Sequence, residues 1–309
     1  MSNDRLRLDW RGARVPHHLG LVLGLMLALL SGCALPPGYS PEHRQINADL
    51  LDRALQPLRS SAAVAADQPL GVYMGIALDG SSPAFDGDIR RARDRLFLQA
   101  ASGPSLLLSN LQAEPLSDPH ADFATMPTAA RAVGEWLRSQ SAQAQRTPLA
   151  TVVIASHGAE DMLVVRTGKT QLLALIKGDY ISAFLKDLGP VPTIVIISAC
   201  HSGSLIPSLR APNRIIITAA AADRVSFGCD ANSAATIFMQ SLLDKELNRS
   251  LSLDELFMQG RNRVIGYEMR TKTAHSLPQM DVGSDMQAFA SVPISQWPKA
   301  LSEWPGAHR

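Results

Sequence analysis

Two apolar segments of the chain end in residues that can carry out nucleophilic chemistry. The run 151–156 (TVVIAS) is followed by His157, and the run 193–198 (TIVIIS) is followed two residues later by Cys200. An imidazole beside a thiol is a common way to generate a thiolate nucleophile near neutral pH. Each residue alone is more often structural, because a free cysteine usually behaves as a small buried hydrophobe. Together, 43 positions apart at the ends of two apolar runs, they predict a nucleophile at Cys200 with His157 as its general base.

Glycines accompany both residues and have a physical role in such a site. Gly158 follows the histidine and lets backbone and substrate approach closely, while Gly203 is expected to form a turn that exposes the thiol. The backbone N–H groups of Gly158 and Cys200 are candidates for an oxyanion hole, which stabilises the charge that develops on a carbonyl oxygen under attack.

The elements that must position these residues alternate between strands and helices. Apolar runs predict strands at 70–78, 105–109, 151–156, 193–198 and 214–218, and a further short strand at 162–166. Helical periodicity predicts helices at 41–56, 89–100, 128–142, 179–188, 233–247 and 252–269. Continuous apolar strands are buried on both faces, and strands separated by helices pair in parallel through right-handed crossovers. The predicted fold class is α/β, a three-layer α/β/α sandwich with a mostly parallel sheet.

This sheet would bring the two chemical residues together. Ligand sites of open α/β sheets lie at the carboxyl ends of the strands. If 151–156 and 193–198 are neighbouring strands, their ends are about 4.8 Å apart. His157 and Cys200 are then expected to face each other across a cleft.

Composition limits the classes of function. The 309 residues carry a formal net charge of +1, with 46% hydrophobic residues, so the chain can bury a sizeable core and lacks the basic excess of a nucleic-acid-binding protein. Three cysteines cannot form a disulfide framework. The sequence has no P-loop, no G-x-G-x-x-G and no H-x-x-x-H or C-x-x-C spacing, so we expect no cofactor and no metal.

The N-terminus has the features of an export signal. Four arginines precede an apolar run at 19–30, which is too short to span a bilayer because spanning needs about 20 residues. The run ends in Leu30-Ser31-Gly32-Cys33, which resembles a bacterial lipobox. That resemblance implies lipidation of Cys33 as the mature N-terminus, and Ala34 after it favours the outer membrane, with the protein facing the periplasm. The alternatives are a signal anchor or a signal peptide without lipidation.

Four segments of the chain resemble bacterial members of the legumain family of cysteine peptidases, which share the caspase-like fold of clan CD. They are ASHG at 155–158, SACHSG at 198–203, RIIITAAAADRVSFGC at 214–229 and LPQMDVG at 277–283. The resemblance implies that His157 is the general base, that Cys200 is the nucleophile and that Ser226 hydrogen-bonds the substrate backbone.

The sequence departs from that family where the family recognises asparagine. The resemblance places His201, Gln240 and Phe85 near the positions at which legumains carry the charged residues of their primary pocket. We therefore expect these residues and Ser226 to bind substrate without a preference for asparagine. Cys229 matches a family position and is interpreted as structural, with a Cys200–Cys229 disulfide as the lesser alternative.

Remaining polar residues have plainer interpretations. Asp88 and Asp94 are expected to serve helix capping and a solvated helix face, and Asp223-Arg224 is expected to be a surface ion pair. His43, His120 and His275 are interpreted as isolated.

Three functions remain open. The first is a cysteine endopeptidase with a peptide or protein substrate. The second is a transpeptidase or transamidase of the same clan, because an acyl-thioester can react with an amine instead of water, and the third is a non-catalytic binding lipoprotein with a caspase-like surface. The predicted organisation is a signal peptide at 1–32, a tether and helix at 33–67, a peptidase domain at 68–290 and a tail at 291–309, with membrane attachment through Cys33 and no nucleic-acid partner.

Overall fold

The computed structural model describes residues 41–60, 69–111, 117–144, 147–167, 171–244 and 246–304. These residues fall within one compact unit of the chain. The predicted signal peptide and the lipidation site at Cys33 lie outside the described residues.

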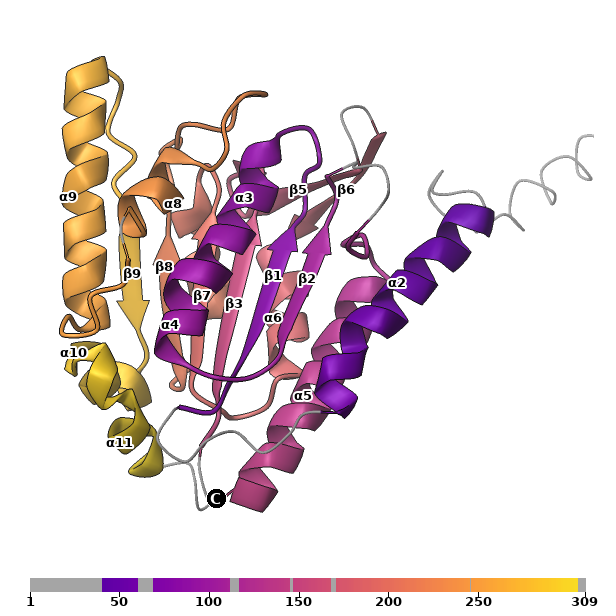
Figure 1. The fold of residues 1–309 in the computed structure, drawn as a ribbon. Helices are drawn as coiled ribbons and strands as arrows, with labels where there is room; N and C mark the ends of the chain where they lie inside the picture. Colours follow the sequence, from indigo (N-terminus) through magenta and orange to yellow (C-terminus); the bar gives the residue numbers. More distant parts are fainter. Residues whose placement is uncertain are drawn as a thin grey trace, which may run out of the picture. The chain divides into compact units, whose positions relative to one another are not determined.

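A six-stranded sheet lies at the centre, in the order β2-β1-β3-β7-β8-β9 (Figure 1). Five strands are parallel, and the sixth, at one edge, is antiparallel to β8. The strands are β1 (Gly71–Ala77), β2 (Ser105–Ser109), β3 (Leu149–Ala155), β7 (Thr193–Ser198), β8 (Arg214–Thr218) and β9 (Gln279–Val282). The predicted mostly parallel sheet is therefore confirmed.

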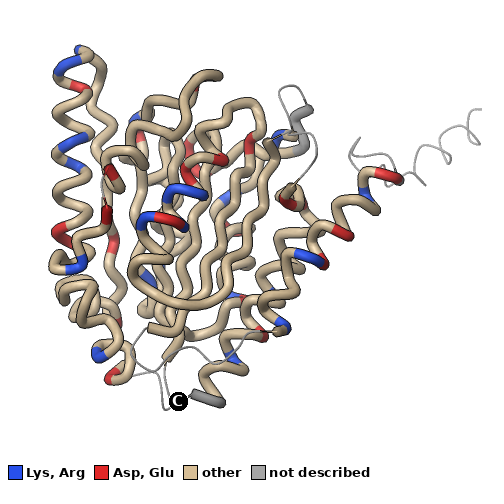
Figure 2. Tube along the Cα trace, in the orientation of Figure 1, with Lys and Arg blue, Asp and Glu red and all other residues tan. Residues whose placement is uncertain are grey.

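Alternate side chains of each strand enter two separate cores. In β1, Val72, Met74 and Ile76 belong to one hydrophobic cluster, while Tyr73 and Ala77 belong to the other. The strands are apolar throughout because both faces are covered, as expected for parallel strands. In Figure 2 most charged residues lie on helices and loops, and the strands are almost free of them.

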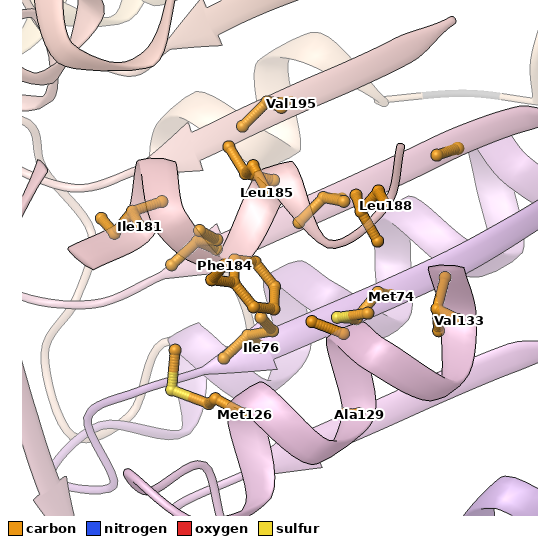
Figure 3. Close-up of a cluster of buried hydrophobic side chains, with 14 of the residues drawn as sticks. Met74, Ile76, Met126, Ala129, Val133, Ile181, Phe184, Leu185, Leu188 and Val195 are labelled. Carbon is orange, nitrogen blue, oxygen red and sulfur yellow. The ribbon is translucent and has the colours of Figure 1, made fainter. Parts of the chain in front are cut away.

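Helices cover each face of the sheet, which makes the three-layer sandwich that the sequence predicts. In Figure 1, α3 lies in front of the strands and α6 behind them. The first cluster is closed by α2 (Pro41–Arg59), α5 (Thr125–Ala144), α6 (Gly178–Lys186) and α7 (Ile206–Leu209). Figure 3 shows part of it, with Met126, Ala129 and Val133 of α5 near Ile181, Phe184 and Leu185 of α6.

The second cluster is closed by helices from the remainder of the chain. These are α3 (Pro83–Ala92), a π-helical turn (Arg93–Phe97) running into α4 (Leu98–Ala100), α8 (Ile237–Leu242), α9 (Leu253–Thr271), α10 (Gln287–Ser291) and α11 (Trp297–Ser302). A capping box begins α9, with Ser252 and Glu255 each bonded to the other's backbone. Short 3₁₀ turns occupy Ser202–Leu205, Ser284–Met286 and Ile294–Gln296.

A small antiparallel sheet follows β3 and differs from the sequence expectation. It consists of β4 (Gly158–Ala159), β5 (Met162–Thr167) and β6 (Gln171–Lys177), of which only β5 was predicted. The next helix begins directly after β6, with Lys177 as its N-cap. Asp179, at which the sequence predicts the helix to begin, therefore lies in the first turn of α6.

The helix predicted at 233–247 is also shorter than expected. Asp230 forms a turn in which its carboxylate accepts the N–H of Asn232 and the hydroxyl of Ser233. Thr236 then caps α8 by accepting the N–H of Met239. Of the helices within the described ranges, none has the length and apolar character needed to cross a membrane.

Candidate active site

The two strands that carry the predicted catalytic residues are neighbours. β3 and β7 pair in parallel, with Ala155 opposite Ser198, and the N–H of Ser156 donates to the carbonyl of Ser198 at 3.1 Å. His157 and Cys200 follow these two strand ends directly, and both are half-buried. The predicted juxtaposition of the two strands is thus confirmed.

Gly158 lies against the backbone of Cys200. A Cβ atom at Gly158 would lie 2.3 Å from the carbonyl oxygen of Cys200 and 3.1 Å from the Cβ of Ala199. Only glycine allows this approach, because a backbone oxygen cannot move aside as a flexible side chain can. The close approach expected of Gly158 is therefore present in the fold.

The turn after the thiol depends on a different residue from the one predicted. His201 has a left-handed backbone with φ of 56°, whereas Gly203 does not have a positive φ. Gly203 is instead required by packing, because a Cβ there would lie 2.5 Å from Oε1 of Gln279 and 2.8 Å from the backbone nitrogen of Ala222.

Three polar atoms of Ser226 lie close to the sulfur of Cys200. The sulfur accepts the backbone N–H of Ser226 at 3.3 Å and lies 3.6 Å from the carbonyl oxygen of the same residue. The Ser226 hydroxyl is 3.8 Å away. A donated N–H suits a sulfur that carries negative charge, since hydrogen bonds to the charged form of a group favour that form.

The imidazole of His157 lies between a phenyl ring and a second thiol. Phe85 packs against it edge to face, with ring centroids 5.0 Å apart. The Nδ1 atom of His157 lies 3.9 Å from the Sγ of Cys229, and within the described part of the chain neither ring nitrogen is hydrogen-bonded to Cys200. Cys229, interpreted from the sequence as structural, thus has a histidine neighbour in space, 72 positions away in the chain.

The surroundings of Cys229 make its thiol less acidic than an ordinary cysteine thiol. Burial raises the pKa of Cys229, and the neighbouring Cys200 thiol raises it further. Both cysteines are free. Two thiols and one imidazole thus share the carboxyl ends of β3 and β7.

The predicted substrate-binding residues have different surroundings. Of the four, Ser226 is the one that is hydrogen-bonded to Cys200. Phe85 is buried, with 1% of its surface exposed, and packs against His157. His201 bonds through Nδ1 to the carbonyl of Ala222 at 3.0 Å. Gln240 lines a cavity of about 510 Å³ between α8 and α9, together with Asn262, Arg263, Tyr267 and Arg270.

Asp88 is not the helix cap that the sequence suggests. Its carboxylate is fully buried and accepts hydrogen bonds from Ser198 and Thr236. Burial raises its pKa from 3.8 to about 7, against the opposing effect of these hydrogen bonds and of Arg91. Asp94 is exposed and bonded to Arg93, as a residue on a solvated face would be. Sequence reasoning missed Asp88 because its partners are 110 and 148 positions away.

A second buried carboxylate fixes the loop between α9 and β9. Glu268 accepts the N–H and hydroxyl of Ser276 and lies 3.0 Å from Nδ1 of His275. His275, interpreted from the sequence as isolated, therefore has a carboxylate partner. The Ser276 carbonyl then accepts the N–H of Ala221, in the loop that follows β8. The expected ion pair of Asp223 with Arg224 is present at 3.5 Å on the surface.

No three or more His, Cys, Asp or Glu side chains within the described ranges converge in a way that could hold a metal ion. The chemical groups that the site does offer are two thiols, an imidazole, a hydroxyl and backbone N–H groups. These are the parts of a cysteine peptidase.

Comparison with known proteins agrees with this class. Residues 142–289 match the model of the Peptidase C13 family, a region that includes His157, Cys200, Cys229 and β9. The resemblance to the legumain family of clan CD that the sequence predicts is confirmed over these residues. No curated protein matches the chain. Among 112 similar solved chains is the crystal structure of caspase-1 from Spodoptera frugiperda, 14% identical, with a TM-score of 0.44 over 70% of this chain and 86% of that chain.

Proposed function

We propose that this protein is a cysteine endopeptidase in which Cys200 attacks the peptide bond and His157 is the general base. The observation that carries the proposal is the position of Cys200 at the carboxyl end of β7, where its sulfur accepts the Ser226 N–H at 3.3 Å beside the end of the strand that carries His157. The match of residues 142–289 to a peptidase family model supports the same reaction.

Cys200 is a better nucleophile than Cys229 on physical grounds. The thiolate is the reactive form of cysteine. The pKa of Cys229 is raised by burial and by the Cys200 thiol, which disfavours its thiolate, whereas Cys200 receives a hydrogen bond suited to negative charge. In addition, the left-handed backbone of His201 turns the chain directly after Cys200. Cys200 itself is half-buried.

The reaction then follows in two steps. His157 takes the Cys200 proton, the sulfur attacks the carbonyl carbon of the scissile bond, and the imidazolium returns the proton to the leaving amine, which leaves an acyl-thioester on Cys200. Water, deprotonated by His157, attacks the thioester and releases the acid and the free thiol. The Cys200 N–H, which has no hydrogen-bond partner among the described residues, is available to the developing oxyanion together with the N–H of Gly158 beside it.

In this structure His157 contacts Cys229, so substrate binding must reorient its imidazole before it can act on Cys200. Catalytic hydrogen bonds are often long or misaligned in unliganded sites and tighten when substrate binds. Rotation of the imidazole from Cys229 toward Cys200 would complete the pair. The same contact favours the non-catalytic alternative, a caspase-like binding domain, if that rotation does not occur.

We place the mature protein at the bacterial outer membrane, anchored through lipid on Cys33 and facing the periplasm. The support is the lipobox-like Leu30-Ser31-Gly32-Cys33 after a short apolar run. Its substrates would then be peptides or proteins of the cell envelope.

Cleavage of a diverse fluorogenic peptide library by the purified protein tests the proposed reaction. Cleavage that disappears in both Cys200→Ala and His157→Ala, and persists in Cys229→Ala, is expected. Absence of cleavage across the library, with the wild-type protein folded, would favour the binding domain. Acyl transfer to an added amine in place of hydrolysis would identify the transpeptidase.

A further inference from the structure

Asp88 is a buried carboxylate held by three donors from two other elements. It lies on α3 with none of its surface exposed. Its Oδ1 accepts the backbone N–H of Thr236 at 2.8 Å, and its Oδ2 accepts the hydroxyls of Ser198 at 2.6 Å and of Thr236 at 2.9 Å. All three donors are neutral groups. Their hydrogen bonds stabilise the charged form of the carboxylate.

The donors belong to two elements beside the candidate active site, β7 and the N-terminus of α8. Ser198 is the last residue of β7 and precedes Cys200 by two positions. Thr236 is the N-cap of α8, and its hydroxyl also accepts the N–H of Met239 at 3.2 Å. Asp88 therefore joins the strand that carries the thiol to the beginning of α8.

The beginning of α8 in turn holds the segment 226–229. The N–H of Ile237, the first residue of α8, donates to the carbonyl of Phe227 at 3.0 Å. The segment 226–229 contacts the sulfur of Cys200 at one end and the imidazole of His157 at the other. A displacement of the α8 N-terminus would consequently move the groups around both catalytic side chains.

The same face of α3 also reaches the general base. Phe85 precedes Asp88 by three positions, and residues with this spacing share a helix face. Its ring packs against His157 with centroids 5.0 Å apart. One helix thus contacts the histidine directly and reaches the thiol strand through Ser198.

A buried carboxylate is costly, and the cost falls on its charged form. Burial raises the pKa of Asp88 to about 7. The titratable groups that act on it are Arg91 on its own helix, Tyr73 on β1 and Cys229 on the segment 226–229. On β7 and α8 its hydrogen-bond partners, Ser198 and Thr236, do not titrate. The ionisation of Asp88 therefore changes in the pH range in which a cysteine–histidine pair operates.

We propose that Asp88 is a positioning residue whose ionised carboxylate holds the end of β7 and the N-terminus of α8 in the arrangement that keeps Cys200 reactive. The inference rests on the proposed function. Protonation of Oδ2 removes an acceptor to which two hydroxyls donate, so the hydroxyl of Ser198 or of Thr236 must turn away. The connection between β7 and the N-terminus of α8 is then weaker. The deprotonated form of Asp88 is therefore the form that keeps Cys200 reactive.

Alkylation of the full chain by iodoacetamide, followed by peptide mass spectrometry, measures the reactivity of Cys200 and Cys229 separately. The proteins compared are the wild type, Asp88→Asn and, as a matched control on the next turn, the exposed Asp94→Asn. Asparagine keeps the size of aspartate but its amide nitrogen cannot accept the hydroxyls. We expect Asp88→Asn to slow alkylation of Cys200 at pH 8 by about tenfold or more, because small misplacements of reacting groups have effects of this size. It should also remove an inflection near pH 7 from the rate profile, while Asp94→Asn keeps the wild-type profile.

The outcomes separate this inference from the proposed function. Wild-type Cys200 that reacts no faster than Cys229 would contradict the proposed peptidase site. Fast wild-type Cys200 with an unchanged rate and pH profile in Asp88→Asn would overturn the role of Asp88 alone. If Asp88→Asn does not fold, Ser198→Ala supplies the test, because it removes one link and leaves Thr236 in place; an unchanged Cys200 rate in this variant would overturn the role as well.

Discussion

The Sγ of Cys229 lies 3.9 Å from Nδ1 of His157, so the imidazole in this structure is directed to the second thiol of the site. Cys200, at the end of the neighbouring strand, is hydrogen-bonded to Ser226 instead. The histidine therefore has two thiols within the same site, and burial raises the pKa of one of them, Cys229.

The two cysteines should differ in reactivity. At pH 7.5 we expect iodoacetamide to alkylate Cys200 at least about tenfold faster than Cys229, because burial raises the pKa of Cys229 and so lowers its thiolate fraction. His157→Ala should slow the reaction at Cys200, and Cys229→Ser should not. Quantitative mass spectrometry of the two cysteine peptides measures both rates, with Cys229 as the internal reference. Equal rates that are unaffected by His157→Ala would contradict the catalytic assignment.

Gly158 should tolerate no side chain. Gly158→Ala would place a Cβ 2.3 Å from the carbonyl oxygen of Cys200, so the end of β3 must move away from the nucleophile. We expect a loss of stability of about 1–3 kcal/mol, the usual cost of overpacking, and a loss of peptide cleavage. Urea unfolding and library cleavage report the two effects.

Gly266 provides the matched glycine control. A Cβ there would meet only the end of the Arg270 side chain, at 3.3 Å, in the middle of α9. Gly266→Ala should stabilise the protein by up to about 1 kcal/mol through helix propensity and leave cleavage unchanged. Wild-type cleavage by Gly158→Ala would show that the close approach is not required.

The core of the fold could be predicted because its strands are unusually clear in the sequence. β7 and β8 begin and end where the apolar runs 193–198 and 214–218 do. β9 was missed because it is an edge strand of four residues that are exposed or half-buried, and therefore shows no apolar run. β6 leads into α6 without a separating turn, so its apolar residues could not be divided between strand and helix from pattern alone.

The chemical residues could be predicted only in part, for a related reason. His157 and Cys200 stand at ends of strong strands, and strand ends are where sites of α/β sheets lie. Asp88 and Cys229 depend on partners 72 to 148 positions away, which local patterns do not reveal. Asp88 in particular lies between Asp86 and Arg90, which do carry the charges of a surface helix.

Asp88 should also make stability depend on pH. The folded-state pKa of about 7 lies above the unfolded value of 3.8, so the folded protein binds more protons between these values. The contribution of this group is therefore fully present below pH 4 and is lost as the pH rises to 7, with a total of about 4 kcal/mol. Asp88→Asn should lack this component.

Thermal or urea unfolding of wild type, Asp88→Asn and Asp94→Asn between pH 4 and pH 8 isolates the effect. The difference in free energy of unfolding between Asp88→Asn and wild type should increase with pH, in favour of the variant, while Asp94→Asn follows the wild type. A difference that is constant with pH would show that Asp88 does not titrate in this range.

The N-terminal anchor gives an independent prediction. Mature protein is expected to begin at a lipidated Cys33 and to partition with membranes, because Leu30-Ser31-Gly32-Cys33 resembles a lipobox. Cys33→Ser should release the protein or leave the precursor uncut. Mass spectrometry of the mature N-terminus checks this, and an unmodified N-terminus at Ala34 or later would contradict it.

Substrate preference should differ from that of legumains at the residue before the cleaved bond. A site built to hydrogen-bond a polar group rejects substrates that lack it, and discrimination by large factors depends on such fixed partners. Here Phe85 is buried against His157, Gln240 bonds to the carbonyl of Ala235 and His201 bonds to the carbonyl of Ala222, so none of the three provides a fixed charge for an asparagine side chain. We therefore expect less polar residues to be accepted at this position.

A peptide library randomised before the scissile bond measures the preference directly. Wild type should cleave after several residue types, with asparagine not favoured. His201→Glu places an acidic side chain directly after the nucleophile and should shift cleavage toward polar side chains. Gln240→Ala, in the cavity between α8 and α9, should change the profile less. Cleavage by the wild type only after asparagine would show that other residues form the pocket, and that the departures at these three positions have no bearing on specificity.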